Sequence, residues 1–124
     1  MDDLIWKVRI SVLWLIYDVA LLVYMILESA ELGVVEQAGP ELLLLFAVVL
    51  LVPLVMAFLS LTLKGSMNRW VNIIVGIVYA VFELLALSEV AAKPSAWAIL
   101  MILSKLVVLA LIVWYAWKWP KKEG

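Results

Sequence analysis

The chain has 124 residues, a formal net charge of −1 and a hydrophobic fraction of 69%, whereas a soluble domain is about 45 to 50% apolar. It has no Cys and no His, which excludes disulfides, thiolate or imidazole metal sites and the usual base at neutral pH, and its charge does not favour nucleic-acid binding. With a mean hydropathy of +1.20, we expect an integral membrane protein in one domain over residues 1–124. We expect the bilayer as its partner, and no enzymatic activity, cofactor, metal or nucleic acid.

Four stretches of the sequence are long and apolar enough to cross a bilayer as helices. A membrane-spanning helix needs about 20 mostly apolar residues, and an open strand cannot replace it because its backbone groups would be unsatisfied in lipid. The stretches cover about residues 4–30, 42–63, 70–87 and 96–118. The predicted fold is therefore all-α, a transmembrane bundle of four helices.

The first connection carries signals for the end of one helix and the start of the next. Gly33 can take the left-handed conformation that closes the first helix. Pro40 is typical of a first helical position, and Glu41 places a carboxylate near the positive end of the helix dipole. We also expect Lys64 and Gly65 to form the basic last turn and the glycine stop of the second helix.

The later helix ends are marked by caps and prolines. Ser66 or Asn68 can cap the third helix, and Ser95 can cap the fourth after Pro94 breaks the chain. Pro120 ends the fourth helix. The predicted connections are short, so no second domain is expected.

Charged and aromatic residues at the span ends predict the orientation. Basic residues near span ends stay in the cytoplasm, and Trp gathers at both membrane interfaces. One side of the predicted bundle holds seven basic residues and the other holds only Lys93, so we expect both termini in the cytoplasm. The seven are Lys7, Arg9, Lys64, Arg69, Lys118, Lys121 and Lys122. The Trp residues follow the same division, with Trp6, Trp70, Trp117 and Trp119 at the inner boundary and Trp97 at the outer boundary.

Two segments resemble a known family. These are LVPLVMAFLSLTLKGSMNRWVNIIVGIVYA over Leu51–Ala80 and LIVWYAWKWP over Leu111–Pro120. Together they are similar to an uncharacterised family of small prokaryotic membrane proteins with four spans, and the KGSMNRW and WYAWKWP motifs carry most of the likeness. The resemblance implies the cytoplasmic, or inner, membrane of a prokaryote and implies no activity.

Three ionisable residues lie within the predicted spans, where a charge costs about 2.5 to 3.5 kcal/mol at the bilayer centre. Glu83 and Lys105 each lie 13 residues from the cytoplasmic boundary (83 − 70 and 118 − 105), and Asp18 lies 11 residues beyond Lys7 (18 − 7). At 1.5 Å per residue these distances are about 20 Å and 16 Å. We therefore expect the three side chains at similar depth, where they can form one charge cluster.

Polar and small residues predict which helix faces meet. Asn72, Gly76, Tyr79 and Glu83 follow a spacing of four, three and four residues, which places them on one face of the third helix. Gly76 allows a neighbouring helix to approach closely. Pro53 is expected to kink the second helix and to free a backbone carbonyl as an acceptor.

Two functional interpretations remain open at this stage. In the first, the protein is a proton- or cation-coupled transporter or a channel subunit that acts as a homo-oligomer. Asp18 and Glu83 are then proton or cation sites, Lys105 is their counter-charge, and Asn72 and Tyr79 are supporting polar ligands. In the second, it is a structural or accessory membrane protein that assembles with itself or with a membrane partner, and its charges serve helix packing.

Overall fold

The computed structural model describes residues 2–33, 39–92 and 95–118, with no side-chain placement for residues 2, 3 and 32. Every regular element in these ranges is an α-helix, as predicted. The helices are α1 (Asp2–Leu32), α3 (Pro40–Thr62), α4 (Gly65–Ala92) and α5 (Ala96–Trp117). All four are long and apolar enough to cross a membrane. This finding confirms the four predicted helices and suggests membrane association.

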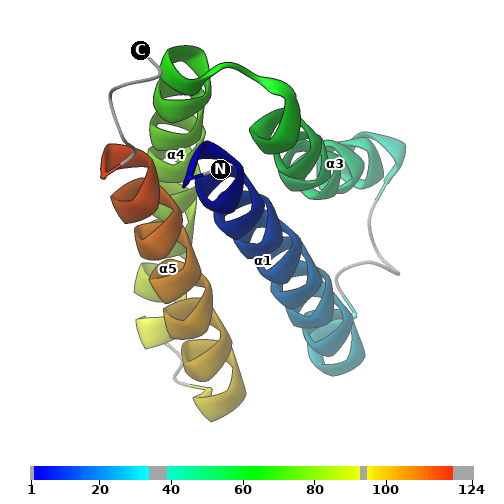
Figure 1. Cartoon of the computed structure of the whole chain (residues 1–124). Coiled ribbons are helices and arrows are strands. Elements are labelled where there is room, and N and C mark those ends of the chain that lie inside the picture. Colours follow the sequence, from blue (N-terminus) through cyan, green and yellow to red (C-terminus); the bar gives the residue numbers. More distant parts are fainter. Residues whose placement is uncertain (1, 34–38, 93–94, 119–124) are drawn as a thin grey trace.

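The helices form a bundle in which α5 packs against both α1 and α4, and α1 also packs along α3. The start of α1, the connection from α3 to α4 and the end of α5 lie at the same end of the bundle (Figure 1). Helices α3 and α4 follow one another in sequence but make few close backbone contacts. Hydrogen bonds from the side chains of Ser60, Asn68 and Tyr79 join them instead.

The first connection agrees with the prediction. Gly33 has a φ of 65°, and its N–H donates to the Ser29 carbonyl at 2.8 Å, so it closes α1 in the left-handed conformation that glycine tolerates. Pro40 is the first residue of α3, and Glu41 lies in the first turn.

The second connection differs from the prediction, because α4 begins at Gly65 rather than near residue 70. Gly65 therefore starts a helix instead of stopping one. Asn68 lies inside α4, and its amide donates to the carbonyls of Ser60 at 2.7 Å and Leu63 at 3.2 Å. The last carbonyls of a helix lack partners within it, so Asn68 caps the end of α3 rather than the start of α4.

The fourth helix begins where predicted. Ser95 precedes α5 and accepts the Ile99 N–H through its backbone carbonyl at 3.0 Å, but its hydroxyl makes no capping hydrogen bond. The predictions for Lys93, Pro94 and Pro120 lie outside the described residues.

The core is a narrow interior stripe, and the outward faces of all four helices are apolar. Gly76 allows α4 and α5 to approach closely, because a Cβ at this position would lie 2.8 Å from Val113 Cγ2 on α5. The close packing predicted for this glycine is thus confirmed. Large apolar side chains such as Leu44, Phe58 and Leu100 are more than 60% exposed, which is the surface expected of helices that face lipid.

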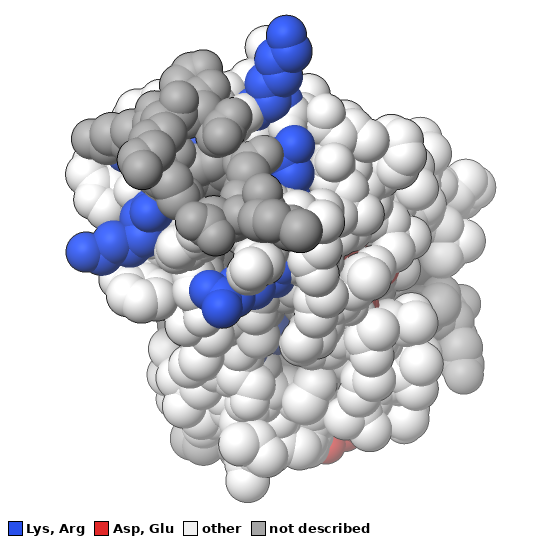
Figure 2. Space-filling model, viewed as in Figure 1, with Lys and Arg blue, Asp and Glu red and all other residues white. Residues whose placement is uncertain are grey.

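Charged side chains are divided between the two ends of the bundle. Lys and Arg gather at the end that holds the N-terminus (Figure 2), where Arg9 lies over the Trp6 ring and Arg69 lies over the rings of Trp70 and Trp117. We call this the basic end. Helices α1 and α4 carry Glu28, Glu31 and Glu89 near their C-termini, and Trp97 lies at the start of α5 beside them. We call this the acidic end.

Candidate functional site

The centre of the site is an ion pair between α4 and α5. The Lys105 Nζ lies 3.0 Å from the Glu83 Oε1, and the two residues are 2% and 4% exposed. Tyr17 on α1 donates its hydroxyl to the Glu83 Oε2 at 2.7 Å. The Lys105 ammonium also lies 4.0 Å from the centre of the Tyr24 ring. The depth match predicted from sequence therefore brings Glu83 and Lys105 into direct contact, and both charges are compensated, as buried charges must be.

Asp18 does not join this pair. It is 9% exposed. Within the described ranges its Oδ1 has no hydrogen-bond partner, and Lys105 pairs with Glu83 instead. Successive residues of a helix point about 100° apart, and Tyr17 is the α1 residue that donates to Glu83. Asp18 is two turns from Ser11, which donates to the Ala57 carbonyl of α3, so it lies on the α3 side of α1.

Asn72 is the hub of a buried polar network that joins three helices. Its Oδ1 accepts from the Trp14 Nε1–H at 2.6 Å and from the Ser60 hydroxyl at 3.1 Å. Its Nδ2 donates to the backbone carbonyl and the Oδ1 of Asn68, at 2.8 and 2.6 Å. The amide is therefore saturated, and it holds α1, α3 and α4 together rather than offering a free ligand. Asn68 was predicted only as a cap. It lies four residues before Asn72, so it shares the polar face of α4 once the helix is known to begin at Gly65.

The Tyr79 hydroxyl donates a hydrogen bond to the backbone carbonyl that Pro53 leaves without a helical partner. Proline has no N–H, so the carbonyl four residues earlier loses its helical partner. That carbonyl belongs to Val49, and it accepts the Tyr79 hydroxyl at 2.9 Å. The predicted free acceptor is confirmed, and it anchors α4 to α3. The rings of Trp14, Tyr17 and Tyr79 meet edge to face, with centroids 5.6 to 6.2 Å apart. This aromatic layer separates the asparagine network from the ion pair.

Two adjoining cavities lie on the acidic side of this layer. The first, the ion-pair cavity, has a volume of about 330 Å³. It is lined by side chains from all four helices, among them Tyr17, Tyr24, Glu28, Tyr79, Phe82, Glu83 and Lys105. The second, the acidic cavity, has a volume of about 460 Å³ and is lined by Tyr24, Glu28, Glu31, Ala86, Glu89, Val90, Ser95, Trp97 and Ala98. Tyr24, Glu28 and Ala86 line both cavities, so the two adjoin at these residues.

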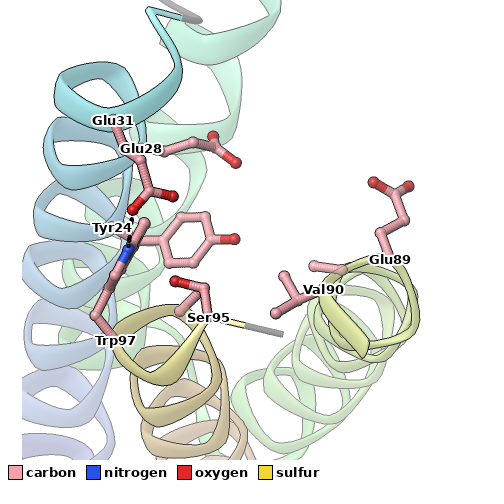
Figure 3. Close-up of a pocket in the computed structure, with 9 residues that line it drawn as sticks. Tyr24, Glu28, Glu31, Glu89, Val90, Ser95 and Trp97 are labelled. Carbon is pink, nitrogen blue, oxygen red and sulfur yellow. Dashed lines mark hydrogen bonds between the residues drawn. The ribbon is translucent and has the colours of Figure 1, made fainter. Parts of the chain in front are cut away.

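The walls of the acidic cavity come from three helices. Figure 3 shows the Tyr24 hydroxyl and the Glu28 side chain directed away from α1, into the space in front of Val90 on α4. The Trp97 Nε1–H donates to the Glu31 Oε2 at 2.9 Å, and the Trp97 ring lies 5.3 Å from the Tyr24 ring. In the described part of the chain, no three acidic side chains converge closely enough to hold a metal ion.

Fold and site together define a small bundle of four apolar helices with a buried ion pair below an acidic cavity. The chain belongs to the family of unknown function DUF6326, whose family model matches residues 3–124. This match confirms the resemblance to an uncharacterised family. No curated protein and no solved structure matches the chain.

Proposed function

We propose that the protein spans the cytoplasmic membrane of a prokaryote four times, with both termini in the cytoplasm. Basic residues and three Trp rings at one end, with carboxylates at the other, support this orientation. The chain has no Cys, so single Cys substitutions can show on which side of the membrane each end of the bundle lies. Glu41→Cys should react with an impermeant maleimide in intact cells, and Ser66→Cys only after permeabilisation. The reverse labelling pattern would refute the orientation.

Within that membrane, we propose that the protein is a transporter or channel subunit for protons or a small cation. The observation that carries this proposal is that cavities adjoin the ion pair on one side. Glu83 and Lys105 line a cavity that adjoins the acidic cavity, whereas the aromatic layer and the saturated Asn72 network lie toward the basic end. A central charged site with cavities on one side and packed side chains on the other is the arrangement expected of a carrier that alternates access.

The residues take separate parts in this mechanism. Glu83 is the proton or cation site, and Lys105 is the counter-charge that holds the carboxylate when no substrate is present. Asp18 is a second acid, with one buried oxygen that has no partner, and we assign it to proton exchange. Asn72 and Tyr79, predicted as ligands, hold the helices in register instead, because their polar atoms are already paired.

We further propose that the protein acts as a homo-oligomer. The basic half of one copy is closed by packed aromatic rings and a buried amide network. A path through the membrane then needs either a conformational change within the bundle or an interface between copies. The exposed apolar faces of α3 and α4 are available for such an interface.

The alternative function is that of a structural or accessory membrane protein, working with itself or with a membrane partner. The observation that favours it is the dryness of the ion pair, whose residues are 2% and 4% exposed and satisfied by each other and by Tyr17. In this case the pair only fixes the register of α4, α5 and α1.

Proton flux into proteoliposomes separates the two functions. Purified protein is reconstituted with a pH-sensitive dye inside, and flux is followed after a pH step, with and without a Na⁺ or K⁺ gradient. Asp18→Asn and Glu83→Gln should each abolish coupled flux, whereas Glu41→Gln on the exposed first turn of α3 should leave it intact. Unchanged flux in both variants would contradict proton coupling. Absence of flux for every common cation would favour the structural role.

A further inference from the structure

The Lys105 ammonium shows what kind of cation this interior holds. Its Nζ is bound by one carboxylate, that of Glu83 at 3.0 Å, and by one aromatic face, that of Tyr24 at 4.0 Å. An aromatic face attracts a cation through its quadrupole, and the attraction grows when water is excluded. A carboxylate beside an aromatic ring is therefore a set of groups that this bundle already uses for an alkylammonium ion.

The acidic cavity has the same kinds of groups and shares one of them, the Tyr24 ring, with Lys105. Carboxylates come from Glu28, Glu31 and Glu89, and a second aromatic ring comes from Trp97. No Lys or Arg is among the described residues that line it. Among these residues the carboxylates therefore have no basic partner, unlike Glu83 in the neighbouring cavity.

Two features select an organic cation rather than a metal ion. A divalent metal needs six or more converging oxygens, or a tight octahedron of them, and in the described residues no such acidic group is formed. The walls also include Ala86, Val90 and Ala98, which can contact an apolar body but offer nothing to a hydrated ion. The Trp97 to Glu31 hydrogen bond holds one ring and one carboxylate in place on the same wall.

We propose that the acidic cavity binds a small organic ammonium ion, with its charged head at Glu28 and its apolar body against Trp97 and Val90. A volume of about 460 Å³ is within the usual range of small-molecule sites, about 300 to 1,000 Å³. Because Tyr24 and Glu28 also line the ion-pair cavity, the bound head lies next to the Lys105 and Glu83 pair. This names the substrate class of the proposed carrier and so rests on the proposed function.

Calorimetric titration of the purified protein in detergent tests binding without requiring transport. The probe is benzylammonium, and benzyl alcohol is the neutral control of similar size. We expect the ammonium to bind and the alcohol to bind at least about tenfold more weakly, which corresponds to one charge-assisted contact. Equal affinity for the two, or no binding of benzylammonium, would overturn the proposal. Competition by Na⁺, K⁺ or Mg²⁺ at equal concentration would also overturn it, in favour of an inorganic cation.

Substitutions then locate the ammonium. Glu28→Gln should weaken benzylammonium binding about tenfold, and Trp97→Leu should weaken it about fivefold, because it removes the ring that contacts the apolar body. Tyr24→Phe keeps the ring that the Lys105 ammonium contacts and should stay near the wild-type affinity. The matched control is Glu41→Gln, the same charge change at a residue that lines neither cavity. If Glu28→Gln and Glu41→Gln have equal effects while both variants keep the wild-type melting temperature, the cavity is not the site.

The two proposals fail in different ways. Ammonium binding that depends on Glu28, without flux of benzylammonium or protons in proteoliposomes, removes the carrier function and leaves the site. Proton flux that depends on Glu83, without ammonium binding in the titration, removes the substrate class and leaves the carrier.

Discussion

The buried Glu83 and Lys105 pair gives the sharpest test of the structure, through a double-mutant cycle. Glu83→Gln keeps the shape of the side chain and an oxygen for Tyr17, but it leaves the Lys105 ammonium buried without a counter-charge. Lys105→Met keeps the length of the side chain and leaves the Glu83 carboxylate with only the Tyr17 hydroxyl. Removing one partner of a buried pair costs about 3 to 5 kcal/mol, and the exposures of 2% and 4% put this pair in that class.

The double variant should lose much less stability than the two single variants combined. Glu83→Gln with Lys105→Met removes both charges, and replacing a whole buried pair by uncharged groups of similar volume is often nearly neutral. If each single change costs about 3 kcal/mol and the double change costs about 1 kcal/mol, the coupling energy is about 5 kcal/mol.

Unfolding in mixed micelles, followed by Trp fluorescence, measures these free energies. Two exposed residues serve as controls, because Glu41→Gln and Lys64→Met make the same chemical changes at the surface. Each of these should change the free energy of unfolding by less than about 0.5 kcal/mol. Costs of the Glu83 and Lys105 changes that simply add, with no coupling, would refute direct contact between the two charges.

Three further predictions follow from the contacts between helices, each read as a change in the free energy of unfolding. Gly76→Ala should destabilise by about 1 to 3 kcal/mol, since its new methyl meets Val113 Cγ2 at 2.8 Å, and Val113→Ala should recover part of this loss. Tyr79→Phe should cost about 1 kcal/mol in the wild type and less in a Pro53→Ala background, where the freed carbonyl regains its helical N–H. Asn72→Leu should cost about 3 kcal/mol, because it leaves the Trp14 N–H on α1 and the Asn68 Oδ1 on α4 buried without their partner; an effect below about 1 kcal/mol would contradict the network.

Properties that depend on distance along a helix could be predicted from the sequence. The depth of Glu83 and Lys105 follows from a fixed rise per residue and from the antiparallel order of consecutive spans, so their contact could be expected. The carbonyl freed by Pro53 follows from the missing proline N–H in the same way. The close approach at Gly76 needs only that some helix packs on that face.

Properties that depend on rotation and on helix pairing could not be predicted. Asp18 and Tyr17 are neighbours in sequence and differ in depth by only about 1.5 Å, yet Tyr17 reaches Glu83 and Asp18 does not. The choice depends on how α1 is rotated against α4 and α5, which the sequence of so apolar a helix leaves open because outward-facing and buried positions are both apolar. The role of Asn68 depended on the start of α4, which extends beyond its apolar stretch to Gly65.

In a carrier whose wild type shows coupled proton flux, exchanging the charges of the ion pair tests whether the carboxylate must lie at position 83. In a structural bundle, Glu83→Lys with Lys105→Glu should restore most of the stability that either single reversal removes, because a pair of opposite charges again joins α4 and α5. In a carrier, the exchange moves the carboxylate to α5, away from the Tyr17 hydroxyl that accompanies it on the α1 side. The exchanged protein should then fold without coupled proton flux. Recovery of both stability and flux would mean that only the net charge at this depth matters, and the assignment of Glu83 as the cation site would be wrong.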